Sequence, residues 1–137
     1  MKSLALLVFL VFFVGCGVNY DTIAQGSTSG INERQELVIM DEEAFKELWD
    51  AHYSTRFPPA ELPVIDFEEE MVIAVFYGMA PTTGYGIRIS RITESKDMLR
   101  VRIKTSRPMG GRAFMALTQP YHIVKLKKSE KPVEFVR

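Results

Sequence analysis

Apolar runs separated by turn-forming residues mark the second half of the chain, and their period predicts β-strands. The run from Met71 to Tyr77 is continuously apolar and rich in Val, Ile and Phe, which predicts a central strand buried on both faces. The segment Leu99–Lys104 alternates between apolar and cationic residues, as expected for a strand with one buried face. Further short strands are predicted at Ile87–Ile92, Tyr121–Leu126 and Val133–Val136.

A single helix is predicted directly after a short strand at Leu37–Met40. Asp41 is a suitable N-cap, and the two glutamates that follow it suit the positive end of the helix dipole. The helix must end before Pro58 and Pro59. Its apolar stripe, from which Trp49 is expected to pack on a sheet, consists of Ala44, Phe45, Leu48, Trp49 and His52.

These elements predict a mainly β (α+β) domain. We expect an antiparallel sandwich or curled sheet of about six strands, with the one helix packed over a side or an end. The parity of the apolar positions changes between Ile123 and Val124, which predicts a β-bulge there. No internal repeat is found, so residues 36–137 are expected to form one domain of common size.

The N-terminal segment has the pattern of an export signal. Lys2 precedes an apolar run, Leu4–Val14, that is too short to span a hydrocarbon core of about 30 Å. Phe13-Val14-Gly15-Cys16 resembles the lipobox of bacterial lipoproteins, although leucine is more usual at the place of Phe13. We therefore expect a signal peptide at residues 1–15 and a lipid on Cys16, which would anchor the chain in the bacterial cell envelope. A plain signal peptide, or a buried helix with an incidental thiol, is the alternative.

A flexible tether is predicted between the lipidated cysteine and the domain. Residues 16–35 are rich in Gly, Ser, Thr, Asn and Gln, with the run Gln25–Gly30 at their centre. Such a composition favours a solvated, mobile chain. We therefore expect these residues to link the lipid to the domain without forming part of it.

The composition argues against a nucleic-acid partner and against stabilisation of the fold by a disulfide or a metal ion. The 137 residues carry 17 basic and 17 acidic side chains, so no net charge draws the protein to nucleic acid. A single cysteine excludes an internal disulfide, and two histidines without a cysteine pair give no zinc-binding spacing. We expect no nucleic-acid partner, no metal and no cofactor.

Charge is balanced overall but divided along the chain. Residues 17–86 carry 13 acidic and 3 basic side chains, whereas residues 87–137 carry 4 acidic and 13 basic ones. The two halves either interleave in the fold and cancel, or make the domain bipolar. In the second case the outward face of one hairpin would meet an acidic partner or anionic lipid headgroups through Arg88, Arg100, Arg102 and Lys104.

Catalytic patterns are absent from the sequence. There is no Gly-x-Ser-x-Gly elbow and no phosphate-binding glycine loop, and His52 and His122 are isolated in the sequence. The acidic residues Glu68–Glu70 lead into a strand and are typical of a solvated turn. We therefore predict that the protein is not an enzyme, with a hydrolase that uses Glu68–Glu70 and His122 as the remaining possibility.

Two loops combine residues that preset the backbone with residues that can contact a partner. Proline fixes φ and glycine permits positive φ, so such loops lose little freedom on binding. The alternatives are a plain β-turn for the first loop and a flexible linker for the second. The candidate partner-binding residues are Ala80, Pro81, Thr82, Thr83, Gly84 and Tyr85 in the first loop, and Arg107, Pro108, Met109, Gly110, Gly111 and Arg112 in the second.

The motifs around these loops resemble the C-terminal domain of the PrcB family. The resemblance rests on the Asp66-Phe67 lead, the strand from Met71 to Tyr77 with Gly78 after it, the Pro81–Tyr85 loop and the stretch Ala116–Lys125, and it covers about residues 64–135. It implies a bacterial envelope lipoprotein, since the family is named for a subunit that associates with and stabilises a surface protease complex. The implied role is that of a non-enzymatic partner of a protease.

A weaker resemblance concerns the first loop alone. Pro81-Thr82-Thr83-Gly84-Tyr85 is similar to the first inhibitory loop of chagasin-type cysteine-protease inhibitors, which are immunoglobulin-like sandwiches. Ala80 stands where those inhibitors have asparagine, Gly110-Gly111 is only loosely similar to their glycine loop, and no Arg-Pro-Trp motif follows. This resemblance implies that Thr82 and Thr83 are tip contacts and that Tyr85 anchors the loop to the core.

Two functional hypotheses follow. The first is a lipid-anchored envelope protein that binds a secreted or surface protease through the two loops and stabilises or regulates it. The second is a structural envelope protein that binds anionic lipid or cell-wall polymer through its basic sheet face. The identity and class of the protease stay open in the first hypothesis.

Overall fold

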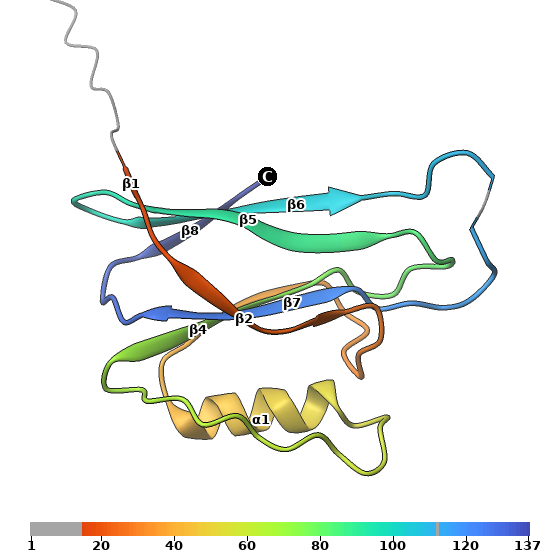
Figure 1. The fold of residues 1–137 in the computed structure, drawn as a ribbon, viewed down its shortest axis with the longest axis horizontal. Helices are drawn as coiled ribbons and strands as arrows, with labels where there is room; N and C mark the ends of the chain where they lie inside the picture. Colours follow the sequence, from red (N-terminus) through yellow and green to blue (C-terminus); the bar gives the residue numbers. More distant parts are fainter. Residues whose placement is uncertain (1–14, 112) are drawn as a thin grey trace, which may run out of the picture.

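Eight strands in the described part of the chain form two four-stranded sheets, and one helix covers the outer side of the second sheet (Figure 1). The structure is a computed structural model that describes residues 15–111 and 113–137. The predicted mainly β sandwich with one packed helix is thereby confirmed, with more strands than the sequence pattern indicated.

The first sheet has the strand order β1-β5-β6-β8. It consists of β1 (Cys16–Gly17), β5 (Gly86–Glu94), β6 (Leu99–Ser106) and β8 (Val133–Val136). The pair β5 and β6 is a hairpin, whereas β8 runs parallel to β6. The expectation of a purely antiparallel fold is therefore wrong at this edge, because the chain passes through the second sheet before it returns to the first.

The second sheet has the order β2-β7-β4-β3, and all its pairs are antiparallel. It consists of β2 (Tyr20–Gly26), β7 (Tyr121–Lys127), β4 (Glu70–Phe76) and β3 (Gln35–Ile39). The helix α1 (Glu42–His52) follows β3 and packs on the side of this sheet that faces away from the first sheet (Figure 1). The second sheet is thus the middle layer of the fold.

Helix α1 begins and packs as its sequence predicts. The Oδ1 atom of Asp41 accepts a hydrogen bond of 2.8 Å from the backbone N–H of Ala44, so this residue is the N-cap. Trp49 is buried against the second sheet, and its indole N–H donates to the carbonyl oxygen of Ala60 at 3.1 Å. The tryptophan thereby also holds the long segment that returns from the helix to β4.

The middle position of the second sheet explains the continuous apolar run in β4. Met71, Ile73 and Val75 face the core between the two sheets. Val72 and Phe76 face the core under the helix, and neither set is exposed by more than 1%. A strand with a core on each side needs apolar residues at every position, as the sequence analysis predicts for this segment.

The tether predicted over residues 16–35 is wrong for Tyr20–Gly26, which form β2 and pair with β7 along its length. The hydroxyl of Tyr20 donates to the carbonyl oxygen of Ile89 across the sandwich at 3.0 Å. Ser29 is also buried, beside the helix. Because β2 is an edge strand with only one neighbour, it tolerates polar residues of the kind that are also typical of a solvated tether.

The predicted bulge lies in the partner strand. The register between β2 and β7 shifts between Thr22 and Ala24, opposite Val124 and Ile123. The strand β7 itself alternates regularly, with Ile123 in the core under the helix and Val124 in the core between the sheets. The change of apolar parity in the sequence therefore reflects two buried faces and does not reflect an extra residue in β7.

All the strand pairings in the two sheets are made within residues 16–136. Every named strand has its neighbours within residues 16–136, and both apolar cores are built from this part of the chain. A protein that begins at Cys16 therefore keeps all the packing described above. No helix in the described ranges has the length and apolar character needed to cross a membrane.

Candidate partner-binding site

Two long loops at one end of the sandwich lie against each other, and we call residues 79–85, 107–111 and 113–118 together the loop platform (Figure 1). The first loop joins β4 to β5, and the second joins β6 to β7. A two-residue antiparallel bridge connects them, in which the N–H of Ala80 donates to Thr118 at 2.8 Å and the N–H of Thr118 donates to Ala80 at 2.9 Å. The two loops singled out from the sequence are therefore one surface.

The adjacent threonines hold the two loops together. The Oγ1 atom of Thr83 accepts from the backbone N–H of Phe114 at 2.9 Å, and the N–H of Thr83 donates to the carbonyl oxygen of Phe114 at 3.1 Å. The carbonyl oxygen of Thr82 accepts from the hydroxyl of Thr118 at 3.0 Å. Their polar groups are thus engaged within the platform, which favours a positioning role over the tip contacts implied by the chagasin-type resemblance.

Gly84 permits the closest approach between the loops. Its φ of +92° is unfavourable for any residue with a side chain. A Cβ atom at this position would lie 2.8 Å from the Cβ atom of Pro108 in the second loop. Beside it the ring of Tyr85 packs on the ring of Tyr77 directly after β4, with centroids 5.6 Å apart. These contacts preset the shape of the platform.

The surface of the platform carries several exposed apolar side chains. Four of its side chains are mostly exposed, namely Met109 at 92%, Phe114 at 77%, Met115 at 94% and Leu117 at 65%, and Met79 is exposed at 49%. Exposed apolar side chains that gather on one part of a folded protein are typical of interaction sites. Large, flexible methionines and an aromatic ring are also favoured residue types for such sites.

Sequence reasoning found only part of this surface. Met109 belongs to the predicted set, but Met79, Phe114, Met115 and Leu117 were missed. A signal for them was present, because Phe114–Leu117 is an apolar run that belongs to no predicted strand. An apolar run without a strand or helix to bury it is expected on a surface that binds something.

Other predicted residues of this site have different places. Ala80 is fully buried in the bridge, so its assignment as a partner contact is corrected to a structural one. Pro81, Arg107, Gly110 and Gly111 are exposed, and Pro108 is half-buried against Gly84. Arg112 lies outside the described residues.

The predicted basic face is present on the outward side of the first sheet. Arg88, Arg102 and Lys104 are exposed and alternate with buried residues of the core between the sheets. Arg100 lies on the same side, half-buried, with its Nη2 atom 3.4 Å from a carboxylate oxygen of Glu134. A register shift after Ile89 brings one further arginine to this side, which the sequence pattern did not show: Arg91 pairs with Arg102.

The charges of the two halves do not interleave everywhere. The outer side of the helix is acidic, because Glu42, Glu43, Glu47 and Asp50 are exposed there. The basic face of the first sheet lies on the opposite side of the molecule, with the second sheet between them. The fold therefore supports the bipolar alternative for these two surfaces.

The two histidines are buried in different cores. His52 is 1% exposed, and its Nδ1 atom lies 2.7 Å from the hydroxyl of Ser29. Burial lowers the pKa of His52 to about 4. The Nδ1 atom of His122 accepts from the backbone N–H of Ile89 at 2.9 Å, and its Nε2 atom lies 2.8 Å from Oγ1 of Thr22. Burial, with a smaller effect of the Arg88 charge, lowers the pKa of His122 below its ordinary value.

The remaining hydrolase hypothesis is not supported by this geometry. In the β4 and β7 pair, Glu70 lies opposite Lys127 whereas His122 lies opposite Val75. At about 3.3 Å per residue, the carboxylates and His122 are thus separated by most of the length of the strands. No group of three or more His, Cys, Asp or Glu side chains in the described ranges is arranged to hold a metal ion.

Part of the chain is similar to a known protein family. Residues 71–127 match the family described as PrcB C-terminal. The matched region runs from β4 to β7, so it contains the loop platform and all the named residues of the basic face. No curated protein and no solved structure matches the chain.

Proposed function

We propose that this chain, whose residues 71–127 match the PrcB C-terminal family, is a lipid-anchored envelope protein that binds a protease. The name of the family points to a protein partner in a protease complex. The partner would be a secreted or surface protease, which the chain stabilises or regulates. The loop platform would be the contact surface, and Cys16 would carry the lipid.

The observation that carries this proposal is the exposed apolar surface on a preset platform. Met109, Phe114 and Met115 are each more than three-quarters exposed, although the loops that carry them are joined by several hydrogen bonds. Exposed apolar side chains on ordered backbone gain free energy on burial and lose little conformational freedom. A solvated linker without a partner is not expected to combine exposed apolar side chains with a backbone held by hydrogen bonds.

The position of Cys16 supports the anchoring part of the proposal. Cys16 is exposed and lies in β1 at the edge of the first sheet, opposite Glu94. Glu94 ends β5, whereas the platform adjoins Gly86 at the start of the same strand. The lipid attachment and the platform would thus lie at opposite ends of the β5 and β6 hairpin, which leaves the platform free for a partner.

The first test replaces apolar side chains of the platform by acidic ones. We expect the variant Phe114→Asp, Met115→Asp to lose capture of the protease from detergent-solubilised envelopes by the full-length chain tagged at its C-terminus. Two hot-spot side chains contribute at least about 2 kcal/mol together, so the measured affinity should fall at least roughly 30-fold. Capture is measured by mass spectrometry, and affinity is then measured with the identified protease.

The matched control makes the same kind of change elsewhere. Phe57 and Val64 are 97% and 95% exposed and lie on the segment between the helix and β4, which is not part of the platform. The variant Phe57→Asp, Val64→Asp should capture the protease as the unchanged chain does. Equal capture by the platform variant, or an equal loss in the control, would contradict the assignment of the platform.

A further inference from the structure

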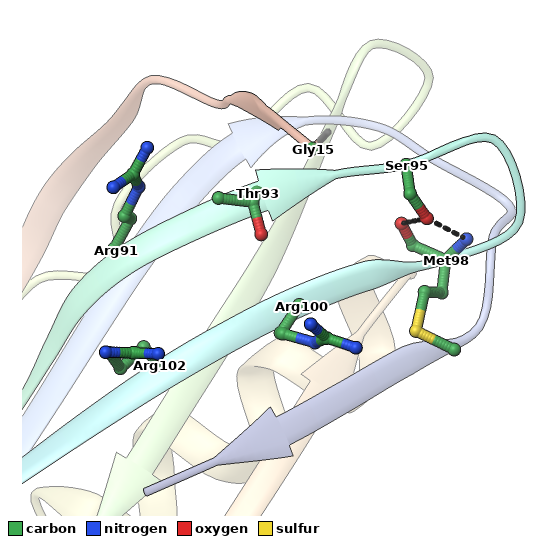
Figure 2. A pocket seen from close by; sticks show the side chains of 7 residues that line it. All are labelled: Gly15, Arg91, Thr93, Ser95, Met98, Arg100 and Arg102. Carbon is green, nitrogen blue, oxygen red and sulfur yellow. Dashed lines mark hydrogen bonds between the residues drawn. The ribbon is translucent and has the colours of Figure 1, made fainter. Parts of the chain in front are cut away.

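A cavity of about 280 Å³ opens on the outward side of the first sheet, at the end that carries β1. Figure 2 shows Arg91 and Thr93 on β5 beside Arg100 and Arg102 on β6, with Ser95 and Met98 at the turn of the hairpin. The lining residues are Gly15, Arg91, Thr93, Ser95, Met98, Arg100 and Arg102. Three guanidinium groups thus border one small depression.

The arrangement of these arginines is not one that the sheet itself favours. Arg91 is the direct cross-strand partner of Arg102, and like charges directly opposite each other destabilise a sheet. Neither side chain has a hydrogen bond or an ion pair within the described ranges, and both are exposed. Arg100 faces Glu134 on β8 at 3.4 Å. The local excess of positive charge would be offset by an anion.

The apolar N-terminal run joins the fold at this cavity. Gly15 lines the cavity and is directly preceded by the apolar run Leu4–Val14. No tether separates that run from the sheet, because Gly17 pairs with Thr93 and the N–H of Val18 donates to Ile92 at 2.8 Å. Any membrane attachment at Cys16 or before it would therefore hold the arginines at the depth of the lipid headgroups.

From the charge of the cavity and the place where the chain enters it, we propose that Arg91, Arg100 and Arg102 bind the phosphate groups of anionic lipids. Guanidinium groups suit this ligand, because their planar N–H donors bind phosphate oxygens in pairs. The outward side of the first sheet would then lie on the bilayer at its β1 end. This inference shares the envelope location with the proposed function but does not depend on a protease partner.

The orientation that follows keeps the loop platform accessible. The hairpin runs from Glu94 and Leu99 beside the cavity to Gly86 and Ser106 beside the platform. At about 3.3 Å per residue this length is roughly 25 Å. Headgroup contacts at one end would therefore fix the direction in which the platform is presented, without covering it.

The test is sedimentation with lipid vesicles of residues 16–137 carrying Cys16→Ser, which keep every described strand pairing and all the residues that line the cavity except Gly15. Vesicles of phosphatidylcholine containing about one third phosphatidylglycerol should bind this protein, and binding should weaken as salt shortens the Debye length from about 10 Å toward 3 Å. The variant Arg91→Gln, Arg102→Gln should bind roughly 30-fold more weakly, since each cation near an anionic surface contributes about a fivefold factor. Its melting temperature should not fall.

A control with the same change of charge separates this site from a general effect. Lys46 and Arg56 are exposed on the helix side of the molecule. The variant Lys46→Gln, Arg56→Gln should bind the vesicles as strongly as the protein that keeps all its arginines and lysines. An equal loss in the control, equal binding to pure phosphatidylcholine, or binding to isolated cell wall in place of vesicles would overturn the proposal. None of these results would change the interpretation of the protease-capture experiment, because that experiment tests residues at the other end of the hairpin.

Discussion

Lowering the pH from 7 to 4 is expected to reduce the free energy of unfolding by about 3 kcal/mol through His52 alone. The pKa of His52 is lowered to about 4 in the folded protein, from an ordinary value of 6.5. As the pH falls through 6.5 the unfolded chain takes up a proton and the folded chain does not. The contribution is therefore complete above pH 6.5 and is lost progressively as the pH falls toward 4.

The surroundings of His52 explain why it stays neutral. Its ring lies edge-on against the rings of Tyr53 and Tyr121, with centroids 4.3 Å and 4.1 Å away. Ser29 is the hydrogen-bond partner of Nδ1, and the Ser29 oxygen also accepts the N–H of Ile31 at 3.0 Å. Nε2 is buried without a hydrogen-bond partner among the described residues. Arg56 lies over the Tyr53 ring, and desolvation by burial is what lowers the pKa of the imidazole.

His122 adds to the same dependence by a different contact. The backbone N–H of Ile89 can only donate, so the Nδ1 atom of His122 must be unprotonated to accept it. The hydrogen is then on Nε2 and is donated to Thr22. Protonation of Nδ1 would break a hydrogen bond that joins the two sheets at the bulge of β5. Because the pKa of His122 is also lowered, this contribution too is lost as the pH falls below 6.5.

Urea unfolding at a series of pH values between 7 and 4 measures the effect. The variant His52→Gln should be less stable at pH 7 but should lose less of its stability on acidification, by about 3 kcal/mol. Carboxylates that titrate in this range affect both proteins equally and cancel in the comparison. Identical pH dependence in the two proteins would show that His52 is not the group responsible.

The elements with strong local patterns were predicted and those that depend on distant contacts were not. The two-sided core around β4 leaves a continuous apolar run from Met71 onward, and the N-cap at Asp41 acts within one turn of helix. By contrast, β2 is polar because it lies at an edge, so Tyr20–Gly26 cannot be told from a tether without their partner β7. The parallel pairing of β8 with β6 also has no local sequence signal.

The candidate site shows the same division. Proline and glycine identified both loops, but the contact between them joins residues that are far apart in the sequence, such as Thr83 and Phe114. The sequence does not show whether Phe114 and Met115 are buried, and only the fold shows that no strand covers them. Arg91 joined the basic face through a register shift, which moves a residue to the other side of a sheet and defeats simple alternation.

Replacing Gly84 by alanine is expected to separate the two loops of the platform. An alanine at φ +92° costs roughly 1–2 kcal/mol in backbone conformation, and the contact at 2.8 Å with Pro108 forces one of the loops to move. We expect the free energy of unfolding to fall by about 2–4 kcal/mol. Capture of the protease should fall as well, because Phe114 and Met115 would no longer be held in one arrangement.

The matched control is Gly110→Ala in the second loop. Gly110 also has a positive φ, +67°, but a Cβ atom there would meet no atom of the described residues within 4 Å. This variant carries the backbone strain without the steric contact, so it should lose only about 1 kcal/mol and should still capture the protease. The difference between the two variants then measures the contact between Gly84 and Pro108. If both behaved alike in urea unfolding and in capture, the two loops would not act as one platform, and each would have to be tested as a separate surface.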